Sequence, residues 1–341
     1  MSRLNKLKLT LGALVAVRLA MLVPAALERP YRGFEAERLI VSIPRGSSAA
    51  QIVAELKRRG VIERPWYFNL LIRWQRAAPE LQAGTYAFRG ASTSREVLHR
   101  LRIGDVVVRA IVVPEGSTVR EIARAFEQIG LGTEREFLAA ARAPELIADL
   151  DPKAGDLEGY LFPDTYHVTL DEGAAALVRR MVERFRQQLG DGLLERVRAQ
   201  EHSVREIVTL ASLVEEETPV AAERPLVAAV FANRLRRGMR LQCDPTVLFA
   251  LERAGRGGRE LDRSDLEFPS AYNTYLNAGL PPGPISSPGR AALEAALEPA
   301  AVRYLYFVAD PQGGHRFSAS LEEHNRQVYA LRRARRQAED G

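Results

Sequence analysis

The sequence predicts an α+β protein in three parts: an N-terminal membrane anchor (residues 1–37), a small strand-turn-helix module (38–130) and a larger mixed α+β domain (131–341). Three observations lead to this fold class. A basic and then apolar segment opens the chain, a strand-turn-helix pattern follows three times, and amphipathic helices then alternate with loops rich in proline and glycine. A chain of 341 residues with 46% hydrophobic residues can bury a sizeable core, and its length suggests two or three domains.

The N-terminal segment has the pattern of a signal anchor. Arg3, Lys6 and Lys8 precede the apolar run Leu9–Leu27, which is close to the roughly 20 residues that span a bilayer. Arg18 interrupts the run, at a cost of about 2.5–3.5 kcal/mol if it lies at mid-span. A cleaved signal peptide and an amphipathic surface helix are the alternatives.

The next segment contains an internal repeat, whose copies begin with Ile43–Ile52, Phe88–Val97 and Val113–Ile122. In each copy an apolar extended stretch reaches a glycine, and a Ser or Thr then stands three residues before Gln or Glu, which is the pattern of a capping box. Such strand-turn-helix units resemble LysM-related modules, which are associated with glycans containing N-acetylglucosamine. The alternative is a packing module that has no ligand of its own.

Beyond the repeat, periodicity and turn residues predict the remaining elements. We expect a helix over Glu134–Leu150 broken near Pro144, long helices over Ala174–Gln200 with a break around Gly190–Gly192, an extended or turn segment at Phe162–Tyr166, helices over Pro225–Arg237 and Glu322–Arg336, a buried strand over Tyr304–Ala309, and loops over 153–159, 255–258 and 281–289.

The stretch Ala211–Thr218 places three carboxylates in a row at the end of an apolar helix. At about 100° per residue, Glu216 points away from the apolar face, whereas Glu215 and Glu217 fall on its two flanks. The apolar face consists of Ile207, Leu210, Ala211 and Val214. A carboxyl group beside an apolar wall loses hydration, so its pKa rises and it can act as a general acid. A solvated acidic helix end is the alternative, and geometry alone does not choose between Glu215 and Glu217.

Composition narrows the classes of partner. The net charge is +5 with a pI near 9.5, and the basic residues are spread along the chain without a helix-turn-helix, RRM or zinc-finger pattern, so we expect no nucleic-acid partner. A basic surface suits anionic lipid or an anionic wall polymer. Cys243, the single cysteine, can form no intramolecular disulfide and has no Cys/His cluster around it, so we expect a semi-buried structural residue and no metal.

Six sequence blocks, in this order, resemble the MltG (YceG-like) family of endolytic murein transglycosylases, and the resemblance runs from about residue 38 to about residue 330. Besides Ala211–Thr218, they are Leu157–Tyr166, Ala232–Leu235 with Gly238–Val247, Ala271–Tyr275, Gly279–Ile285 and Tyr304–Asp310.

The resemblance implies a reaction and its acid. In that family the last acidic residue of the glutamate motif is catalytic, which corresponds to Glu217. The family cleaves the β-1,4 bond between N-acetylmuramic acid and N-acetylglucosamine in nascent glycan strands, forms 1,6-anhydromuramyl ends, and uses no cofactor. It usually carries one N-terminal anchor. The resemblance therefore implies a single-pass inner (plasma) membrane protein with its catalytic domain outside the cytoplasm, and peptidoglycan strands, the membrane and candidate peptidoglycan synthases as partners.

Candidate substrate-binding residues surround the motif in sequence. Gln242 and Asp244 lie in a Gln-Cys-Asp-Pro turn, where they can bond sugar hydroxyls or only the turn backbone. The run Tyr272, Asn273, Thr274 and Tyr275 combines aromatic faces with amide and hydroxyl groups, as sugar clefts do, or forms a satisfied polar core. Gln-Cys also departs from the family's more usual Gln followed by Ser or Thr.

Two further candidates complete the set. Glu158, beside Gly159, is a second candidate for a buried carboxylate, with a structural hydrogen-bond acceptor as its alternative. His315 follows the Gly313-Gly314 turn and either lines a cleft or is structural. For the whole chain, the alternative function is a non-catalytic glycan-binding scaffold of the cell-wall synthesis machinery, and the intact Glu217 motif favours the enzyme.

Overall fold

The computed structural model describes residues 28–310 and 313–339, and it has the predicted α+β character. The chain divides into two compact units: Met1–Arg109 with His167–Asp171, and Ala110–Tyr166 with Glu172–Gly341. The predicted anchor, Leu9–Leu27, lies outside the described residues. Within the part that is described, no helix combines the length and apolar character needed to cross a bilayer.

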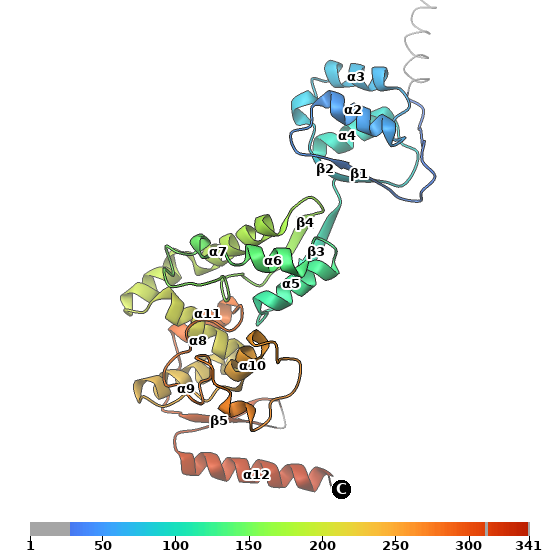
Figure 1. The fold of residues 1–341 in the computed structure, drawn as a ribbon. Helices are drawn as coiled ribbons and strands as arrows, with labels where there is room; N and C mark the ends of the chain where they lie inside the picture. The colour runs from blue at the N-terminus through green and yellow to red at the C-terminus, as the bar shows by residue number, and fades with distance from the viewer. Residues whose placement is uncertain (1–27, 311–312, 340–341) are drawn as a thin grey trace, which may run out of the picture. The chain divides into compact units, whose positions relative to one another are not determined.

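The first unit is a two-stranded antiparallel sheet covered by helices (Figure 1). Val41 and Ile43 alternate with exposed residues along the first strand, so one face of the sheet is buried. Helix residues such as Leu56 and Phe68 complete this core. The elements are, in order, β1 (Leu39–Ile43), α2 (Ala49–Arg58), α3 (Pro65–Trp74), β2 (Gly84–Phe88) and α4 (Ser94–Ile103).

The predicted repeat is present as three strand-turn-helix copies, each with its capping box. In every copy the Ser or Thr side chain accepts a hydrogen bond from the N3 backbone, and the N3 side chain accepts one from the cap backbone. The pairs are Ser48 with Gln51, Thr93 with Glu96, and Thr118 with Glu121.

The third copy, β3 (Val108–Val112) and α5 (Val119–Gln128), lies largely in the second unit. The division between the units therefore falls at Arg109, whereas the sequence placed a domain boundary at residue 130. Tertiary contacts explain this, since β3 pairs with β4 (Thr165–Thr169) and α5 packs on α6 (Glu134–Ala140). Similarity between repeats in sequence does not determine which neighbours each copy acquires.

The second unit is mostly helical, and most of its elements agree with the sequence. The break in the helix beginning at Glu134 is a 3-10 turn at Pro144–Leu146, and the long helix has non-helical angles at Gly190. Residues 281–289 form no helix or strand. The further elements are α7 (Ala174–Ala199), α8 (Val204–Glu217), α9 (Arg224–Arg236), α10 (Asp244–Arg253), α11 (Arg290–Leu297), β5 (Tyr306–Ala309), β6 (His315–Ser318) and α12 (Leu321–Glu339).

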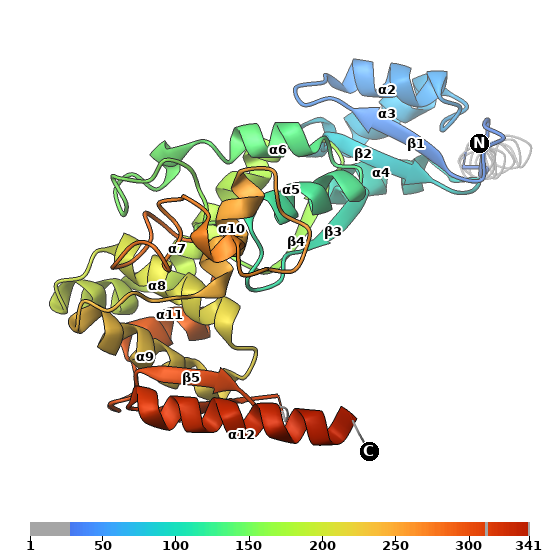
Figure 2. The same ribbon diagram turned by 60° about the horizontal axis from the view of Figure 1, so that its bottom comes forward.

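Helix α8 is the central helix of this unit. It packs against α7, α9, α10 and α11, and Figure 1 shows it between these neighbours. The antiparallel pair of β5 and β6 lies beside α9, with α12 along it (Figure 2). Helix α8 thus contacts α9 and α10, and these helices, with β6, contribute the neighbours of its last residue.

Candidate active site at the end of helix α8

The three carboxylates end a helix that is buried on every side, not on one face only. Thr209, Ser212 and Leu213 are buried along with the predicted apolar face. Because Glu215, Glu216 and Glu217 are the last three residues of α8, they lie at the negative end of its dipole, which disfavours ionised carboxylates. Their surroundings nevertheless differ, and the differences separate their roles.

Glu215 is held in a structural ion pair. Its side chain is only 5% exposed, one oxygen lies 2.7 Å from the guanidinium of Arg224, and the other accepts a hydrogen bond from Gly289 N at 2.8 Å. Burial raises the pKa of Glu215, and these two contacts oppose the rise. Both oxygens are used to tie the end of α8 to α9 and α11, so this carboxyl group is poorly available to a ligand.

Glu217 has different neighbours, contributed by three other elements. The thiol of Cys243, the N-cap of α10, donates a hydrogen bond to its carboxylate. Burial raises the pKa of Glu217, whereas the thiol lowers it. Cys243 is 1% exposed and its own pKa is raised well above the usual value by burial and by Glu217. The semi-buried cysteine expected from the sequence is therefore fully buried and contacts the candidate acid.

Two cationic or ionisable side chains act on Glu217 from either side. The guanidinium of Arg234 on α9 is almost buried and donates to Leu305 O at 2.7 Å and to Leu241 O at 2.6 Å. His315 on β6 is held by Glu223, with its Nδ1 2.7 Å from Oε2 and its backbone N donating to Oε1 at 2.9 Å. Both side chains exert electrostatic effects that favour the ionised form of Glu217.

The start of α10 and the loop after this helix supply the next groups. The hydroxyl of Tyr275 donates to Asp244 Oδ1 at 2.5 Å, and this bond together with burial raises the pKa of Tyr275. Asp244 is exposed and raises the pKa of Glu217 electrostatically. Gln242 is exposed as well, with φ of 51°, and its backbone N donates to Thr274 O at 3.2 Å. Non-glycine residues rarely adopt this conformation, so contacts with other segments of the chain must hold the turn in place.

Asn273 and Thr274, two buried polar residues, make the contacts that hold this turn. Both are buried, and the Asn273 amide donates to Leu266 O and Phe268 O at 3.0 and 2.9 Å. Thr274 Oγ1 accepts a hydrogen bond from Cys243 N at 3.0 Å. The satisfied polar core that the sequence left open is thus what these two residues form, and it fixes the turn that carries Cys243.

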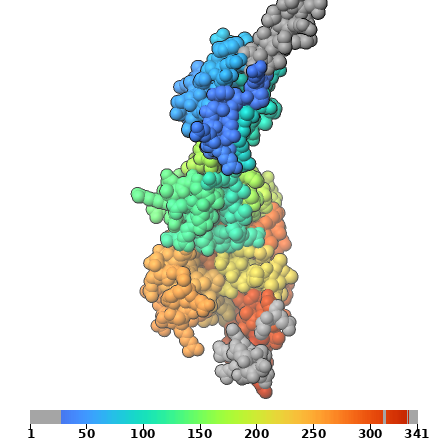
Figure 3. All heavy atoms as spheres, turned by 90° about the vertical axis from the view of Figure 1, so that its right-hand side faces the viewer, coloured from blue at the N-terminus to red at the C-terminus, as the bar shows by residue number. Residues whose placement is uncertain are grey.

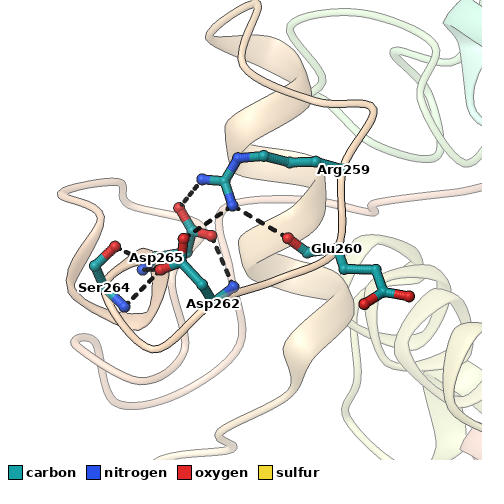
Figure 4. Close-up of polar contacts among 5 residues, drawn as sticks. All are labelled: Arg259, Glu260, Asp262, Ser264 and Asp265. Atoms are coloured by element: carbon teal, nitrogen blue, oxygen red, sulfur yellow. Dashed lines mark hydrogen bonds and ion pairs between the residues drawn. The ribbon is translucent and has the colours of Figure 1, made fainter.

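The loop after α10 is organised by a compact polar network (Figure 4). Arg259 donates to Asp265 Oδ1 at 2.5 Å, and the other oxygen of Asp265 accepts from Asp262 N at 3.0 Å. Asp262 in turn accepts from the backbone and hydroxyl of Ser264. Asp265 is buried, and the arginine beside it holds the pKa of its carboxyl below the usual range. This network orders the segment whose carbonyls receive the Asn273 amide.

Glu216 points outward, as the helical phase predicts, and its exposed side chain lines a hollow at the surface. The hollow measures about 410 Å³ and is also lined by Glu121, Arg124 and Phe249. Although the side chain is exposed to water, the surrounding walls desolvate it and raise the pKa of Glu216 to about 7, and Glu121 and the neighbouring glutamates add to the rise.

The remaining two predicted residues lie in a different place. Glu158 is 8% exposed and accepts a hydrogen bond from Val119 N at 3.0 Å, so the structural acceptor role holds for one oxygen. It lines a pocket of about 220 Å³, and burial raises its pKa well above the usual value. Tyr272 packs on Phe249, which lines the same pocket, with ring centroids 5.0 Å apart.

The predicted residues thus fall into three groups. Those near Glu217 are Gln242, Asp244, Tyr275 and His315. Asn273 and Thr274 support the turn that carries Cys243, and Glu158 and Tyr272 lie away from Glu217. Sequence reasoning missed Cys243, Arg234 and Glu223 as neighbours of this site. An asparagine and an arginine within apolar helix α9 were a usable signal, since buried polar residues require partners. Among the described residues, no group of His, Cys, Asp and Glu could hold a metal ion.

Comparison with known proteins identifies the relatives of this chain. Residues 41–330 match the YceG-like family. The chain is 33% identical over 302 residues to the endolytic murein transglycosylase of Bacillus subtilis, covering 84% of this chain and 82% of that protein. The Streptococcus pneumoniae D39 protein of the same name is 30% identical over 321 residues, which cover 84% of this chain and 57% of the relative.

A solved structure shows the same relation in three dimensions. A YceG-like protein from Listeria monocytogenes, determined at 2.6 Å, has 34% sequence identity and a TM-score of 0.58. The match covers 86% of this chain and all of the Listeria chain. The family match extends over well more than half of the sequence, and the chain belongs to the YceG-like family.

Proposed function

We propose that this protein is an endolytic murein transglycosylase in which Glu217 is the catalytic acid and base. The activity is that of the curated relatives, which are named endolytic murein transglycosylases. Murein strands are the substrate that this name implies. The observation that supports the residue assignment is the environment of Glu217, a carboxyl with a raised pKa, free of any ion pair as close as that of Glu215, and surrounded by exposed polar groups.

The chemistry requires a proton at the glycosidic oxygen and an acceptor afterwards. Protonated Glu217 donates to the oxygen that leaves with N-acetylglucosamine as the bond to C1 of N-acetylmuramic acid breaks, through an oxocarbenium-like transition state. The resulting carboxylate then accepts the proton of the C6 hydroxyl while O6 bonds to C1. The proton given is the proton regained, no water is consumed, and the product is a 1,6-anhydro ring.

The neighbours of Glu217 suit both halves of this cycle. Burial favours the protonated acid, whereas the Cys243 thiol and the charge of Arg234 favour the carboxylate. Opposing effects of this kind bring a carboxyl pKa toward the operating pH, where one group both donates and accepts efficiently. Asp244, Tyr275, Gln242 and His315 are the candidates for contact with sugar hydroxyls. Gln242 and Asp244 flank Cys243 at the start of α10, Tyr275 bonds Asp244, and His315 lies on β6.

Digestion of purified peptidoglycan tests the proposal. The wild-type chain is expected to release fragments that end in 1,6-anhydro-N-acetylmuramic acid, with cuts within strands, and mass spectrometry identifies these ends. Reducing ends alone would mean a water nucleophile and a hydrolase. Binding of strands without any cleavage would favour the scaffold function.

The proposal also covers where the protein is located and what its first unit does. We infer that residues Leu9–Leu27 anchor the chain in the inner (plasma) membrane, with the active site outside the cytoplasm, because basic residues precede the run and murein lies outside. The LysM-like module, with its β1-α2-α3-β2 order, is a candidate glycan binder, and peptidoglycan synthases are candidate partners. Fractionation of the native chain and of Arg18→Leu tests the anchor: an entirely cytosolic protein in both cases would contradict it.

A further inference from the structure

The Glu158 pocket has a composition that the cleavage reaction does not explain. It lies between the start of α5, helix α6 and helix α10, and Figure 3 shows the orange surface around residue 250 next to the green surface of the α5–α6 region. Its volume is about 220 Å³, enough for one small group and not for a strand of sugars. The lining residues include Arg120, Arg142, Asp156, Phe249, Glu252 and Arg253, with Glu158.

The arginines of this pocket are not all paired with the acidic residues that line it. Asp156 lies 3.4 Å from Arg253, and Glu252 lies 3.4 Å from Arg124, so both anionic groups have a cation beside them. The side chains of Arg120 and Arg142 form no ion pair or hydrogen bond among the residues described. Two arginines without an ion pair thus line this small pocket, Arg120 half-buried and Arg142 exposed, and a planar anion satisfies guanidinium donors best.

Glu158 supplies the third polar group. Its side chain is more than nine-tenths buried, Oε1 accepts from Val119 N, and Oε2 has no hydrogen-bond partner in the described part of the chain. Burial raises the pKa of this carboxyl well above the usual value and so favours its protonated form. A protonated carboxyl has an O–H to donate, so it matches an acceptor on a ligand and not a cation.

We propose that this pocket binds a carboxylate of the stem peptide on a murein strand, with Arg120, Arg142 and Glu158 as its donors. The inference rests on the proposed murein substrate. N-acetylated sugars are neutral and the lactyl group of muramic acid is amide-linked, so in the strand itself the carboxylates belong to the peptides. Leu138, Ala141 and Phe249 provide apolar walls for a peptide side chain such as an alanine methyl.

The position of the pocket suits such a role in substrate selection. It shares Thr118, Phe249 and Glu252 with the hollow of Glu216, the residue next to the proposed acid. A peptide held there would bind outside the Glu217 site, since neither the pocket nor the hollow is lined by Glu217. The pocket would then favour strands that carry stem peptides with free carboxylates over strands stripped of peptides.

Binding of a matched pair of ligands tests the proposal on the full-length chain in detergent. The ligands are N-acetylmuramyl-L-alanyl-D-glutamate and its diamide, neither of which contains a glycosidic bond that the enzyme could cut. Calorimetry is expected to show that the free acid binds at least about tenfold more tightly, as for charge-assisted hydrogen bonds to guanidinium groups. Equal binding of acid and diamide would overturn the proposal.

Variants test whether the preference for the free acid over the diamide arises in this pocket. Arg120→Gln and Arg142→Gln should each remove most of it, whereas Arg179→Gln, which deletes the same charge at an exposed position of α7, should leave it unchanged. Glu158→Ala should weaken binding of the acid, and Glu158→Gln, which restores an N–H donor, should recover it. A preference that survives both pocket arginine variants would contradict the assignment.

Competition and cleavage separate the remaining explanations. Acetate or inorganic phosphate that displaces the muramyl peptide at equal concentration would show a general anion site and overturn the peptide assignment. If the wild-type chain forms anhydro ends from strands but binds the free acid and the diamide equally, only this inference is refuted. Absence of anhydro ends from the wild-type chain would instead refute the proposed function.

Discussion

Glu217 and Glu158 are both carboxyl groups whose burial raises the pKa, yet their surroundings assign them different tasks. Glu217 meets a thiol donor and the side chains of Arg234 and His315, which oppose the effect of burial, whereas Asp244 adds to it. Glu158 receives one backbone N–H and otherwise lines a pocket, so burial dominates and favours the neutral acid. The comparison teaches that a raised pKa alone does not mark a catalytic acid; the groups that stabilise the ionised form distinguish a residue that cycles its proton from one that keeps it.

The largest expected effect is a loss of cleavage activity, which distinguishes Glu217 from Glu158. Glu217→Gln keeps the shape and removes the transferable proton, so cleavage of peptidoglycan should fall by about 10³-fold or more, within the range of general acid–base catalysis. Release of anhydromuramyl ends measures the rate, and circular dichroism checks the fold. A Glu217→Gln chain that cuts strands at the normal rate would falsify the assignment of the acid.

Glu215 tests whether the third buried carboxyl is structural. Glu215→Ala leaves Arg224 largely buried with only Glu115, at 3.2 Å, as a partner, so the free energy of unfolding should fall by about 3 kcal/mol. Urea denaturation measures the loss. Stability equal to that of the wild type would show that the ion pair contributes little and would reopen the choice between Glu215 and Glu217.

Glu158 should make the protein less stable as pH rises. Its folded pKa is raised, so above pH 4.5 the folded state holds a proton that the unfolded state releases, and stability falls until the folded pKa is passed. Each unit of raised pKa corresponds to about 1.4 kcal/mol. Unfolding of Glu158→Gln at pH 5 and pH 8 should show a smaller decrease than the wild type; an identical decrease would remove the basis for a neutral Glu158.

Substitution of Cys243 should change the pH dependence of cleavage more than it changes the maximal rate of cleavage. Cys243→Ala removes the donor that favours ionised Glu217, so the pKa of Glu217 should rise further and the alkaline limb of kcat/KM should move to higher pH. Cys243→Ser retains a donor and serves as the control. An alkaline limb that stays in place in the alanine variant would separate the thiol from the catalytic acid.

The smallest effect is expected at Glu216. Glu216→Gln should leave cleavage within about twofold of the wild type, because the side chain points away from Glu217's neighbours and its exposed position limits any effect on stability. Assays at pH 6 and pH 8 bracket its pKa of about 7. Loss of activity in this variant, with an active Glu217→Gln, would transfer the catalytic role to Glu216.

Local patterns in the sequence predicted the local structure well. The capping boxes at Ser48, Thr93 and Thr118 and the break at Gly190 are encoded within a few residues, because a cap or a glycine acts on its own turn. The family resemblance likewise placed residues 38–330 in the correct family, close to the 41–330 match. The helical phase also gave the outward direction of Glu216.

The sequence by itself therefore determined the elements, the family and the cluster of three glutamates, since each depends on neighbours along the chain. Only the tertiary structure decided that Glu215 pairs with Arg224, that Cys243 reaches Glu217, and that Glu158 lies in a separate pocket with Arg120 and Arg142. It also placed the third repeat largely in the second unit. The physical reason is that burial, ion pairing and pKa depend on atoms brought together from distant segments, and periodicity within one helix does not specify those partners.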